Sequence, residues 1–477
     1  MTGLKREACL IDGEWVKAER WIEVDDPATG EIVGRVPNLG KVETDRAIAA
    51  AARAMDPWAR LTGKDRARIL RRFYDAIMAH QDELAALLTQ EQGKPLAEAK
   101  GEIAYAASFI EWFSEEAKRV YGDVIPSHAP DKRIVVLKQP IGVVAAITPW
   151  NFPAAMITRK IGPALAAGCG VVVKPASQTP FSALALGVLA MEAGLPAGLL
   201  NIVTGSSTEI GGALTASDLV RKLSFTGSTE IGAKLYSQCA PTIKKLSLEL
   251  GGNAPFIVFD DADVEAAVAG AMQSKFRNAG QTCVCANRIY AQAGIYEAFA
   301  TRLAAATAKL QVAPGNQAGA EIGPLIDLKA VAKVREHIED ATGRGARVLT
   351  GGSAHARGGR FFTPTVLADV TPAMLVSREE TFGPVAPVFR FSDENDAIAQ
   401  ANSTQFGLAA YFYARDLGRV WRVAERIEAG IVGVNTGLIS TEVAPFGGVK
   451  ASGLGREGSR HGMDDYLEMK YVCLGLG

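Results

Sequence analysis

Two cysteines, Cys283 and Cys285, lie one residue apart in the stretch FRNAGQTCVCAN, residues 276–287. A thiolate is both a nucleophile and a metal ligand, so this spacing admits a nucleophile, a metal site, a disulfide or buried filler. The neighbouring residues are polar and include a glycine, and we expect a turn that precedes a helix, where the pKa of a thiol can fall. On these local grounds a nucleophile and an inert buried thiol both stay open.

Metal binding is the weakest of these alternatives. The five histidines are too far apart in the chain to form a local metal motif, and Cys-x-Cys without a further Cys or His cluster is poor for zinc. We therefore predict no metal site. A disulfide between the two cysteines would close a strained ring. Cys285 is expected to be a small buried residue. The alternative is that Cys285 pairs reversibly with Cys283 on oxidation.

A nucleophile needs a base and a donor for the oxyanion. Glu249 ends the apolar stretch KKLSLEL, where a charge is unusual, and Asn151 follows the strand-like VVAAITPW. Both are therefore candidates, although the sequence alone does not bring them to Cys283.

Two segments are suited to a nucleotide. In LSFTGSTEIG a strand meets Gly227 and Ser228 before a helix, and the free N–H groups of a helix N-terminus suit a phosphate. Lys174 follows the buried strand of VVVKPAS, and ligands of open α/β sheets lie at the carboxyl ends of strands.

One literal G-x-G-x-x-G is formed by Gly453, Gly455 and Gly458 in SGLGREG. The dinucleotide fingerprint requires a strand before it and a helix after it, whereas the preceding FGGVKAS is typical of a turn. We expect a glycine-rich surface loop here.

The order of predicted elements indicates two α/β domains. The chain of 477 residues opens with short antiparallel strands, continues with helices over about 43–119, and then alternates strands with helices, which favours parallel sheets. A second series of strands follows Gly252, so we place the join near Gly251 and Gly252. The tail DYLEMKYVCLGLG is predicted to be a strand without an obvious partner nearby, suited to another sheet or subunit.

Composition excludes several classes of function. A formal net charge of -1 argues against nucleic-acid or anionic-membrane partners. No run of about 18 apolar residues is present, and the first residues lack the apolar core of a signal peptide. Six cysteines are too few for a disulfide scaffold, and free thiols suit a reducing compartment, so we expect a cytoplasmic protein.

Seven motifs in order resemble the aldehyde dehydrogenase superfamily over nearly the whole chain. They are TPWNFP (148–153), KPASQTP (174–180), FTGSTEIG (225–232), LELGGN (248–253), GQTCVCANR (280–288), EETFGPV (379–385) and PFGGVKASGLGREG (445–458). The resemblance implies that Cys283 attacks an aldehyde carbonyl and that Asn151 stabilises the oxyanion with the Cys283 backbone N–H. A thioester follows hydride transfer, and Glu249 activates the water that hydrolyses it.

The same resemblance implies a nicotinamide cofactor. Lys174 and Glu380 match residues that hold its riboses, Phe382 one beside the nicotinamide, Trp150 one near an adenine-side pocket, and Ser228 a pyrophosphate contact.

Ser177 bears on the choice of cofactor. Relatives strict for NAD often have glutamate there, which would repel a 2′-phosphate, whereas serine leaves Lys174 free to meet it. We therefore predict that NADP is preferred and that NAD is accepted.

Within the superfamily the chain is most similar to succinate-semialdehyde dehydrogenases. The resemblance implies that Arg159, Arg277 and Ser440 hold the far carboxylate of the substrate. Glutarate semialdehyde is the nearest alternative, because one methylene changes discrimination by only about 1–3 kcal/mol. A cofactor-independent thiol hydrolase and a non-catalytic binding protein are alternatives of other classes.

The resemblance also implies the fold: a Rossmann-like cofactor domain, an α/β catalytic domain and a small β oligomerisation flap. The expected ranges are 1–121 and 141–251, 252–451, and 122–140 with 452–477. The resemblance implies a homo-oligomer, either a dimer or a tetramer, and we expect a homotetramer.

Overall fold

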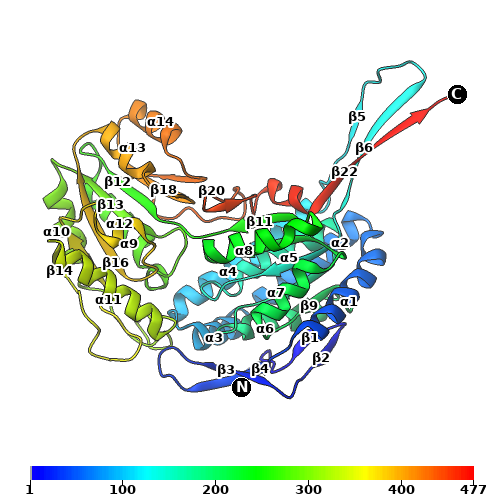
Figure 1. Ribbon diagram of the computed structural model, residues 1–477, viewed down its shortest axis with the longest axis horizontal. Helices are drawn as coiled ribbons and strands as arrows, with labels where there is room; N and C mark the ends of the chain where they lie inside the picture. Colours follow the sequence, from blue (N-terminus) through cyan, green and yellow to red (C-terminus); the bar gives the residue numbers. More distant parts are fainter. Residues whose placement is uncertain (1–2) are drawn as a thin grey trace.

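A computed structural model gives the structure of residues 3–477, which form two lobes and a projecting flap (Figure 1). The first lobe is built on an eight-stranded sheet of order β2-β1-β9-β8-β7-β10-β11-β21. Its strands are β1 (Cys9–Ile11), β2 (Glu14–Val16), β7 (Val143–Ile147), β8 (Val171–Lys174), β9 (Leu200–Ile202), β10 (Val220–Thr226), β11 (Lys245–Glu249) and β21 (Gly453–Leu454).

Helices cover both faces of this sheet because its central strands bury alternate residues on opposite sides. Val144 and Ala146 belong to one hydrophobic core, and Val143 and Ala145 belong to the other. The helices are α1 (Lys41–Ala59), α2 (Gly63–Ala79), α3 (Gln81–Gln92), α4 (Leu96–Glu116), α5 (Ala155–Ala167), α6 (Pro180–Glu192), α7 (Ser207–Ala216), α8 (Thr229–Cys239) and η1 (Ala240–Thr242).

The second lobe is built on a seven-stranded sheet of order β14-β15-β16-β13-β12-β18-β19. Its strands are β12 (Ala254–Val258), β13 (Ala286–Gln292), β14 (Arg347–Thr350), β15 (Thr365–Ala368), β16 (Val385–Phe391), β18 (Ala409–Tyr413) and β19 (Ile431–Val434). Its helices are α9 (Val264–Phe276), η2 (Arg277–Gly280), α10 (Tyr296–Thr307), α11 (Leu328–Gly343), α12 (Leu375–Arg378), α13 (Glu394–Asn402) and α14 (Leu417–Arg426). Two small sheets pair β3 (Trp21–Asp25) with β4 (Ile32–Pro37), and β17 (Phe406–Gly407) with β20 (Val449–Lys450).

The flap is a three-stranded sheet of order β22-β6-β5 that projects away from both lobes (Figure 1). It contains β5 (Asp123–Ile125), β6 (Lys132–Pro140) and β22 (Leu467–Gly475), and η3 (Arg460–Tyr466) leads into β22. The predicted tail strand is confirmed, but its partner lies in the same chain, because Leu467 pairs with Pro140 and Gly475 with Lys132. A partner more than 300 residues earlier in the chain leaves no local pattern in the sequence.

The expectation of a glycine-rich surface loop at 453–458 is wrong. Gly453 and Leu454 form β21, which pairs with Glu249 and Leu248 at the end of β11. A side chain at Gly453 would place its Cβ 1.8 Å from the Leu248 carbonyl oxygen, so the glycine permits this close approach. The segment carries the buried Glu457 under the candidate site, and a 3-10 helix follows it in place of the α-helix that a dinucleotide fingerprint requires.

Candidate active site

The candidate residues meet at the carboxyl edge of the first sheet. Ile147 is in register with Lys174 on one side and with Phe225 on the other, and Thr226 is in register with Glu249. Because these strands are parallel, the segments that follow them open at the same edge. This arrangement brings the predicted oxyanion, phosphate and base segments together.

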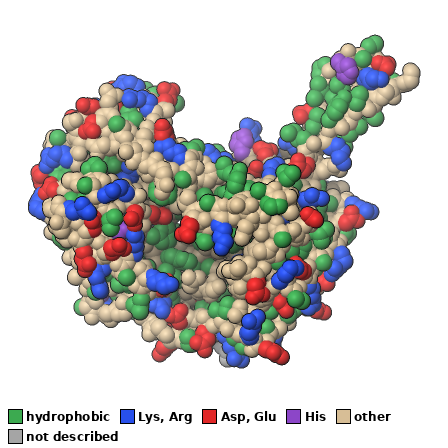
Figure 2. All heavy atoms as spheres, viewed as in Figure 1, with side chains coloured by type: hydrophobic (Ala, Val, Ile, Leu, Met, Phe, Trp, Pro, Cys, Tyr) green, Lys and Arg blue, Asp and Glu red, His purple; other side chains and the backbone are tan. Residues whose placement is uncertain are grey.

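A cavity of about 210 Å³ at this edge contains the thiol. Figure 2 shows that this face of the molecule is hollowed between the two lobes. The cavity is lined by residues from both lobes, namely Pro149, Trp150, Asn151, Thr226, Gly227, Ser228, Leu250, Gly251, Cys283, Glu380 and Phe382.

Cys283 follows a turn of unusual backbone conformation. Asn278, Ala279 and Gly280 all have left-handed dihedrals, with φ of 51°, 54° and 76°. The turn is followed by β13, a member of the second series of strands that the sequence predicts, and not by a helix. The side chain of Cys283 is half-buried, yet the groups packed around it desolvate the thiol and raise its pKa to about 12, against the opposing charge of Arg159. Burial thus opposes the lowered thiol pKa that the polar turn led us to expect.

Glu249 is the last residue of β11 and is 2 % exposed. Neither carboxyl oxygen has a hydrogen-bond partner among the described residues. Burial raises the pKa of Glu249 well above its usual value, and the nearby charge of Glu457 adds to this, while Arg159 and Lys160 oppose it. An unpartnered carboxyl of this kind is rare in a stable core and suits a proton acceptor.

Asn151 is buried and directs its amide toward the nucleophile loop. Its Nδ2 donates to the Gln281 carbonyl oxygen at 3.1 Å, and its Oδ1 has no partner among the described residues. The second N–H of Nδ2 is the group that would donate to an oxyanion in the cavity.

A buried ion cluster lies behind these residues, and sequence reasoning missed it. Arg159 donates through Nε to Glu457 Oε2 at 2.8 Å, its Nη2 lies 2.6 Å from the same oxygen, and Lys160 pairs with Glu457 Oε1. Burial alone would raise the pKa of Glu457, but Lys160 and Arg159 lower it to about 2. Glu457 is therefore charged, and the only clue to it in the sequence was the motif that contains it.

The predicted substrate residues fall into two groups. Arg277 and Ser440 line a small recess of about 10 Å³ behind the nucleophile loop. Arg159 is 1 % exposed and already paired with Glu457, so it does not line this recess, although its guanidinium lies 4.0 Å from the centre of the Phe446 ring.

Most residues expected to hold a cofactor line the cavity, but Lys174, at the end of β8, and Ser177, in the segment after it, do not. Burial lowers the pKa of Lys174 to about 8, and its Nζ donates to the Pro175 carbonyl oxygen at 3.2 Å without a carboxylate partner among the described residues. Ser177 is half-exposed beside it. Ser228 caps α8, and Gly227 accepts no side chain, since a Cβ there would lie 2.4 Å from the Phe225 ring.

Glu380 and Phe382 come from the opposite lobe. Glu380 Oε1 accepts the Gly252 N–H at 3.3 Å, and burial raises the pKa of Glu380 to about 8. Phe382 has φ of 51°, a strained value for an aromatic residue, and its ring packs edge-on against Trp150 with centroids 5.6 Å apart. Trp150 thus lies beside Phe382 in the cavity that contains the thiol.

Cys285 is fully buried and points away from the cavity. Its Sγ donates to the Lys275 carbonyl oxygen at 3.3 Å, and burial raises its pKa. Both cysteines are free thiols here. This environment agrees with a small buried residue, and a redox partnership with Cys283 stays a prediction.

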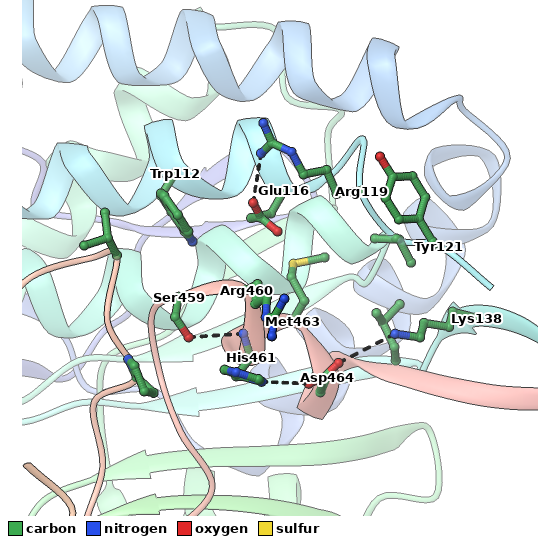
Figure 3. Close-up of a pocket in the computed structure, with 14 residues that line it drawn as sticks. Trp112, Glu116, Arg119, Tyr121, Lys138, Ser459, Arg460, His461, Met463 and Asp464 are labelled. Carbon is green, nitrogen blue, oxygen red and sulfur yellow. Dashed lines mark hydrogen bonds and ion pairs between the residues drawn. The ribbon is translucent and has the colours of Figure 1, made fainter. Parts of the chain in front are cut away.

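A larger cavity, of about 670 Å³, lies at the base of the flap (Figure 3). Trp112 and Glu116 on α4 face Ser459, His461 and Asp464 on the C-terminal segment (Figure 3). It contains none of the predicted catalytic residues, so size alone does not locate the chemistry. Among residues 3–477, no group of three or more potential ligands could hold a metal ion, and no helix is long and apolar enough to cross a membrane.

Fold, thiol, oxyanion amide and buried carboxyl together define an enzyme of aldehyde oxidation. The aldehyde dehydrogenase family model matches residues 15–472, and the chain belongs to this family. The expected α/β fold class and the sequence resemblance are both confirmed.

Two relatives and one solved structure match over nearly the full length. A glutarate-semialdehyde dehydrogenase of Pseudomonas aeruginosa is 66% identical over 474 residues, which are 99% of this chain and 98% of the relative. The NADP(+) succinate-semialdehyde dehydrogenase GabD of Escherichia coli is 66% identical over 477 residues, which are 100% of this chain and 99% of the relative. The crystal structure of an E. coli NADP-dependent enzyme has a TM-score of 0.99 at 66% identity, with 100% and 99% coverage.

Proposed function

We propose that this aldehyde dehydrogenase oxidises succinate semialdehyde to succinate, with NADP preferred over NAD. The observation that carries the substrate is the placement of Arg277 and Ser440 in one recess behind the loop that presents Cys283. A guanidinium there suits a carboxylate at the far end of a short aldehyde.

In the proposed reaction the Cys283 sulfur adds to the aldehyde carbonyl, and its proton passes to a base. Asn151 Nδ2 and the Cys283 backbone N–H receive the oxyanion of the thiohemiacetal. A nicotinamide cofactor, which Ser228, Glu380 and Phe382 would hold, would supply the hydride acceptor, and loss of hydride from the adduct would leave a thioester on Cys283. Glu249 then removes a proton from water, which attacks the thioester and releases the acid and the thiol. Burial raises the pKa of Glu249, which makes its carboxylate a stronger base than that of an exposed glutamate.

The residues present fit an NADP cofactor. Lys174 offers a buried ammonium without an acidic neighbour, which suits a 2′-phosphate, and Ser177 brings no charge to repel it. Ser228 and the N-terminus of α8 suit the pyrophosphate, while Glu380 and Phe382 line the far side of the cavity. The E. coli relative named for NADP(+) supports the same choice.

Glutarate semialdehyde is the second candidate, because a relative of equal identity is named for it. A panel of aldehydes of increasing length, with and without a terminal carboxylate, separates the candidates when each is assayed with both cofactors. The highest kcat/KM for succinate semialdehyde with NADP supports the proposal. A maximum kcat/KM for glutarate semialdehyde would support the second candidate instead. Equal kcat/KM values for uncharged aldehydes would contradict both candidates. Membership of this family gives no support to the two alternatives of other classes, a cofactor-independent thiol hydrolase and a non-catalytic binding protein.

The proposal also includes three domains, with ranges 1–121 and 141–251, 252–451, and 122–140 and 452–477. It further includes Arg159 as a second anchor for the substrate carboxylate and a homo-oligomeric assembly. The two large sheets and the three-stranded flap support the ranges. A cytoplasmic location rests on the six free thiols, which suit a reducing compartment.

A further inference from the structure

A single backbone carbonyl joins the oxyanion amide to the nucleophile loop. The Gln281 oxygen accepts from Asn151 Nδ2 at 3.1 Å and from Asn278 Nδ2 at 3.2 Å. Asn278 Nδ2 also donates to the backbone oxygen of Asn151 at 3.1 Å. The side-chain amide of Asn278 therefore bonds to the backbone of Asn151 and also to the Gln281 oxygen that accepts from the Asn151 side chain.

The orientation of the Asn278 amide is fixed by its surroundings. Two carbonyl oxygens face Nδ2, while Oδ1 accepts from Gln92 Nε2 at 3.0 Å, so a flipped amide would lose all three bonds. The backbone N–H of Asn278 donates to Glu98 Oε2 at 2.8 Å. Asn278 is 1 % exposed and does not line the cavity of the thiol, so it reaches the chemistry only through its neighbours.

The backbone of this turn needs such support. Asn278 and Ala279 adopt left-handed dihedrals in succession before Gly280, and this backbone conformation is strained for residues that carry a side chain. Side-chain bonds from α3 and α4 hold the turn in place.

The Asn151 side is held by a buried ion pair. Lys94 Nζ donates to the Asn151 backbone oxygen at 2.7 Å and to Glu102 Oε2 at 2.6 Å, and both side chains are 1% exposed. Glu102 Oε1 accepts the Ala154 N–H at 2.9 Å, at the start of α5. The oxyanion segment and the nucleophile loop are thus fastened to the same pair of helices.

We propose that Asn278 is a positioning residue that sets the distance between the oxyanion amide of Asn151 and the Cys283 loop. It touches neither substrate nor cofactor, and it acts by keeping the second N–H of Asn151 aimed at the cavity. This inference rests on the proposed aldehyde oxidation.

A double-mutant cycle between Asn278 and Asn151 tests it. Asn278→Gly keeps a left-handed backbone accessible and removes the amide, so kcat per active site should fall about 10- to 100-fold while KM changes less than about threefold. In an Asn151→Ala background the same change should lower kcat by less than about twofold, because the amide through which Asn278 acts is already absent. Independent effects that multiply in the double variant overturn the proposal, as does an unchanged kcat in the single variant.

Two further variants guard against a loss of folding. Asn278→Asp keeps the shape and the Oδ1 acceptor but lacks the donor, so it should repeat the fall in kcat if Asn278→Gly does not fold. Asn201 is a matched control, because its buried Nδ2 donates to the Gly198 oxygen at 2.6 Å and its strand, β9, contributes no residue to the cavity of the thiol. Asn201→Gly should lower the free energy of unfolding and leave kcat per active site unchanged, and an equal fall in kcat would overturn the proposal.

The outcomes separate this inference from the proposed function. If the wild type reduces neither cofactor with any aldehyde, the proposed function fails. If the wild type is active and the cycle is multiplicative, only the positioning role fails.

Discussion

At the scale of single residues, burial shapes the acidity of the groups at the site. It raises the pKa of both Cys283 and Glu249 above their usual values. Behind the cavity, the Glu457 carboxylate pairs with two cations, Arg159 and Lys160. Nucleophilic attack therefore begins with the loss of a proton, and the reaction should quicken as pH rises.

The first prediction concerns the reactivity of the thiol without cofactor. Below a pKa of about 12 the thiol is protonated, so its thiolate fraction rises about tenfold per pH unit. The rate of Cys283 alkylation by iodoacetamide should therefore climb without a plateau between about pH 7 and pH 10. Mass spectrometry of the Cys283 peptide measures this rate, and a plateau near neutral pH would show a thiolate in the resting enzyme.

The second prediction concerns the substrate anchor. Arg277→Ala should lower kcat/KM for succinate semialdehyde about ten- to a hundredfold, because a hydrogen-bonded charge in the recess is lost. Butanal, which lacks the carboxylate, should be nearly unaffected. Arg277→Lys is the control that keeps the charge, and equal losses for both aldehydes would refute the anchor role.

The sequence singled out the three proposed catalytic residues but not their surroundings. Cys283, Glu249 and Asn151 lie in motifs, whereas the partner of Arg159 is Glu457, 298 residues along the chain. Asn278 was predicted only as part of a turn. Its role as a bridge to Asn151 depends on a contact between the two lobes that no local pattern contains.

At the scale of elements, we expect the end of β8 to decide the choice of cofactor. Lys174 closes the strand in register with Ile147, which leaves Ser177 in the loop beside it. Because burial lowers the pKa of Lys174 to about 8, its ammonium loses charge as pH rises through that value. The preference for NADP should therefore weaken above about pH 8.

The third prediction changes this loop. Ser177→Glu places a carboxylate near Lys174, where it repels a 2′-phosphate and accepts from a 2′-hydroxyl. The ratio of kcat/KM with NADP to that with NAD should fall at least about tenfold, since facing like charges cost several kcal/mol. Ser177→Gln is the uncharged control. A ratio that does not move in Ser177→Glu, or a wild type that strongly prefers NAD, would contradict the assignment.

Regular elements were predictable where their patterns are local. Apolar runs predicted β8 and β10, and the strand–turn–helix at Gly227 appears as β10 followed by α8. Glycines misled the prediction at 453–458, because the same residues that favour a surface turn also permit a backbone to pack against β11.

At the scale of the molecule, the flap leaves apolar surface uncovered. Hydrophobic side chains gather along it (Figure 2), and Val124 is 83% and Met469 74% exposed. Its outer strand, β22, is also an edge strand of nine residues, which natural proteins rarely leave free. Both features favour association with other copies of the chain.

The fourth prediction follows from this surface. Light scattering should give a native mass of two or four times the 50.4 kDa chain. Replacing Val124 and Met469 by Asp should reduce that mass, whereas Val42→Asp, which changes an exposed residue on α1, should not. A wild-type monomer would contradict the proposed oligomer.

The covalent role of Cys283 is the central claim, and Glu249→Gln tests it most directly. With succinate semialdehyde and NADP, this variant should form one reduced cofactor per active site in a burst and then stall, because no base activates water. Mass spectrometry of the quenched protein should find a succinyl thioester on Cys283. Steady turnover at the wild-type rate, or a burst without an adduct on Cys283, would contradict the account.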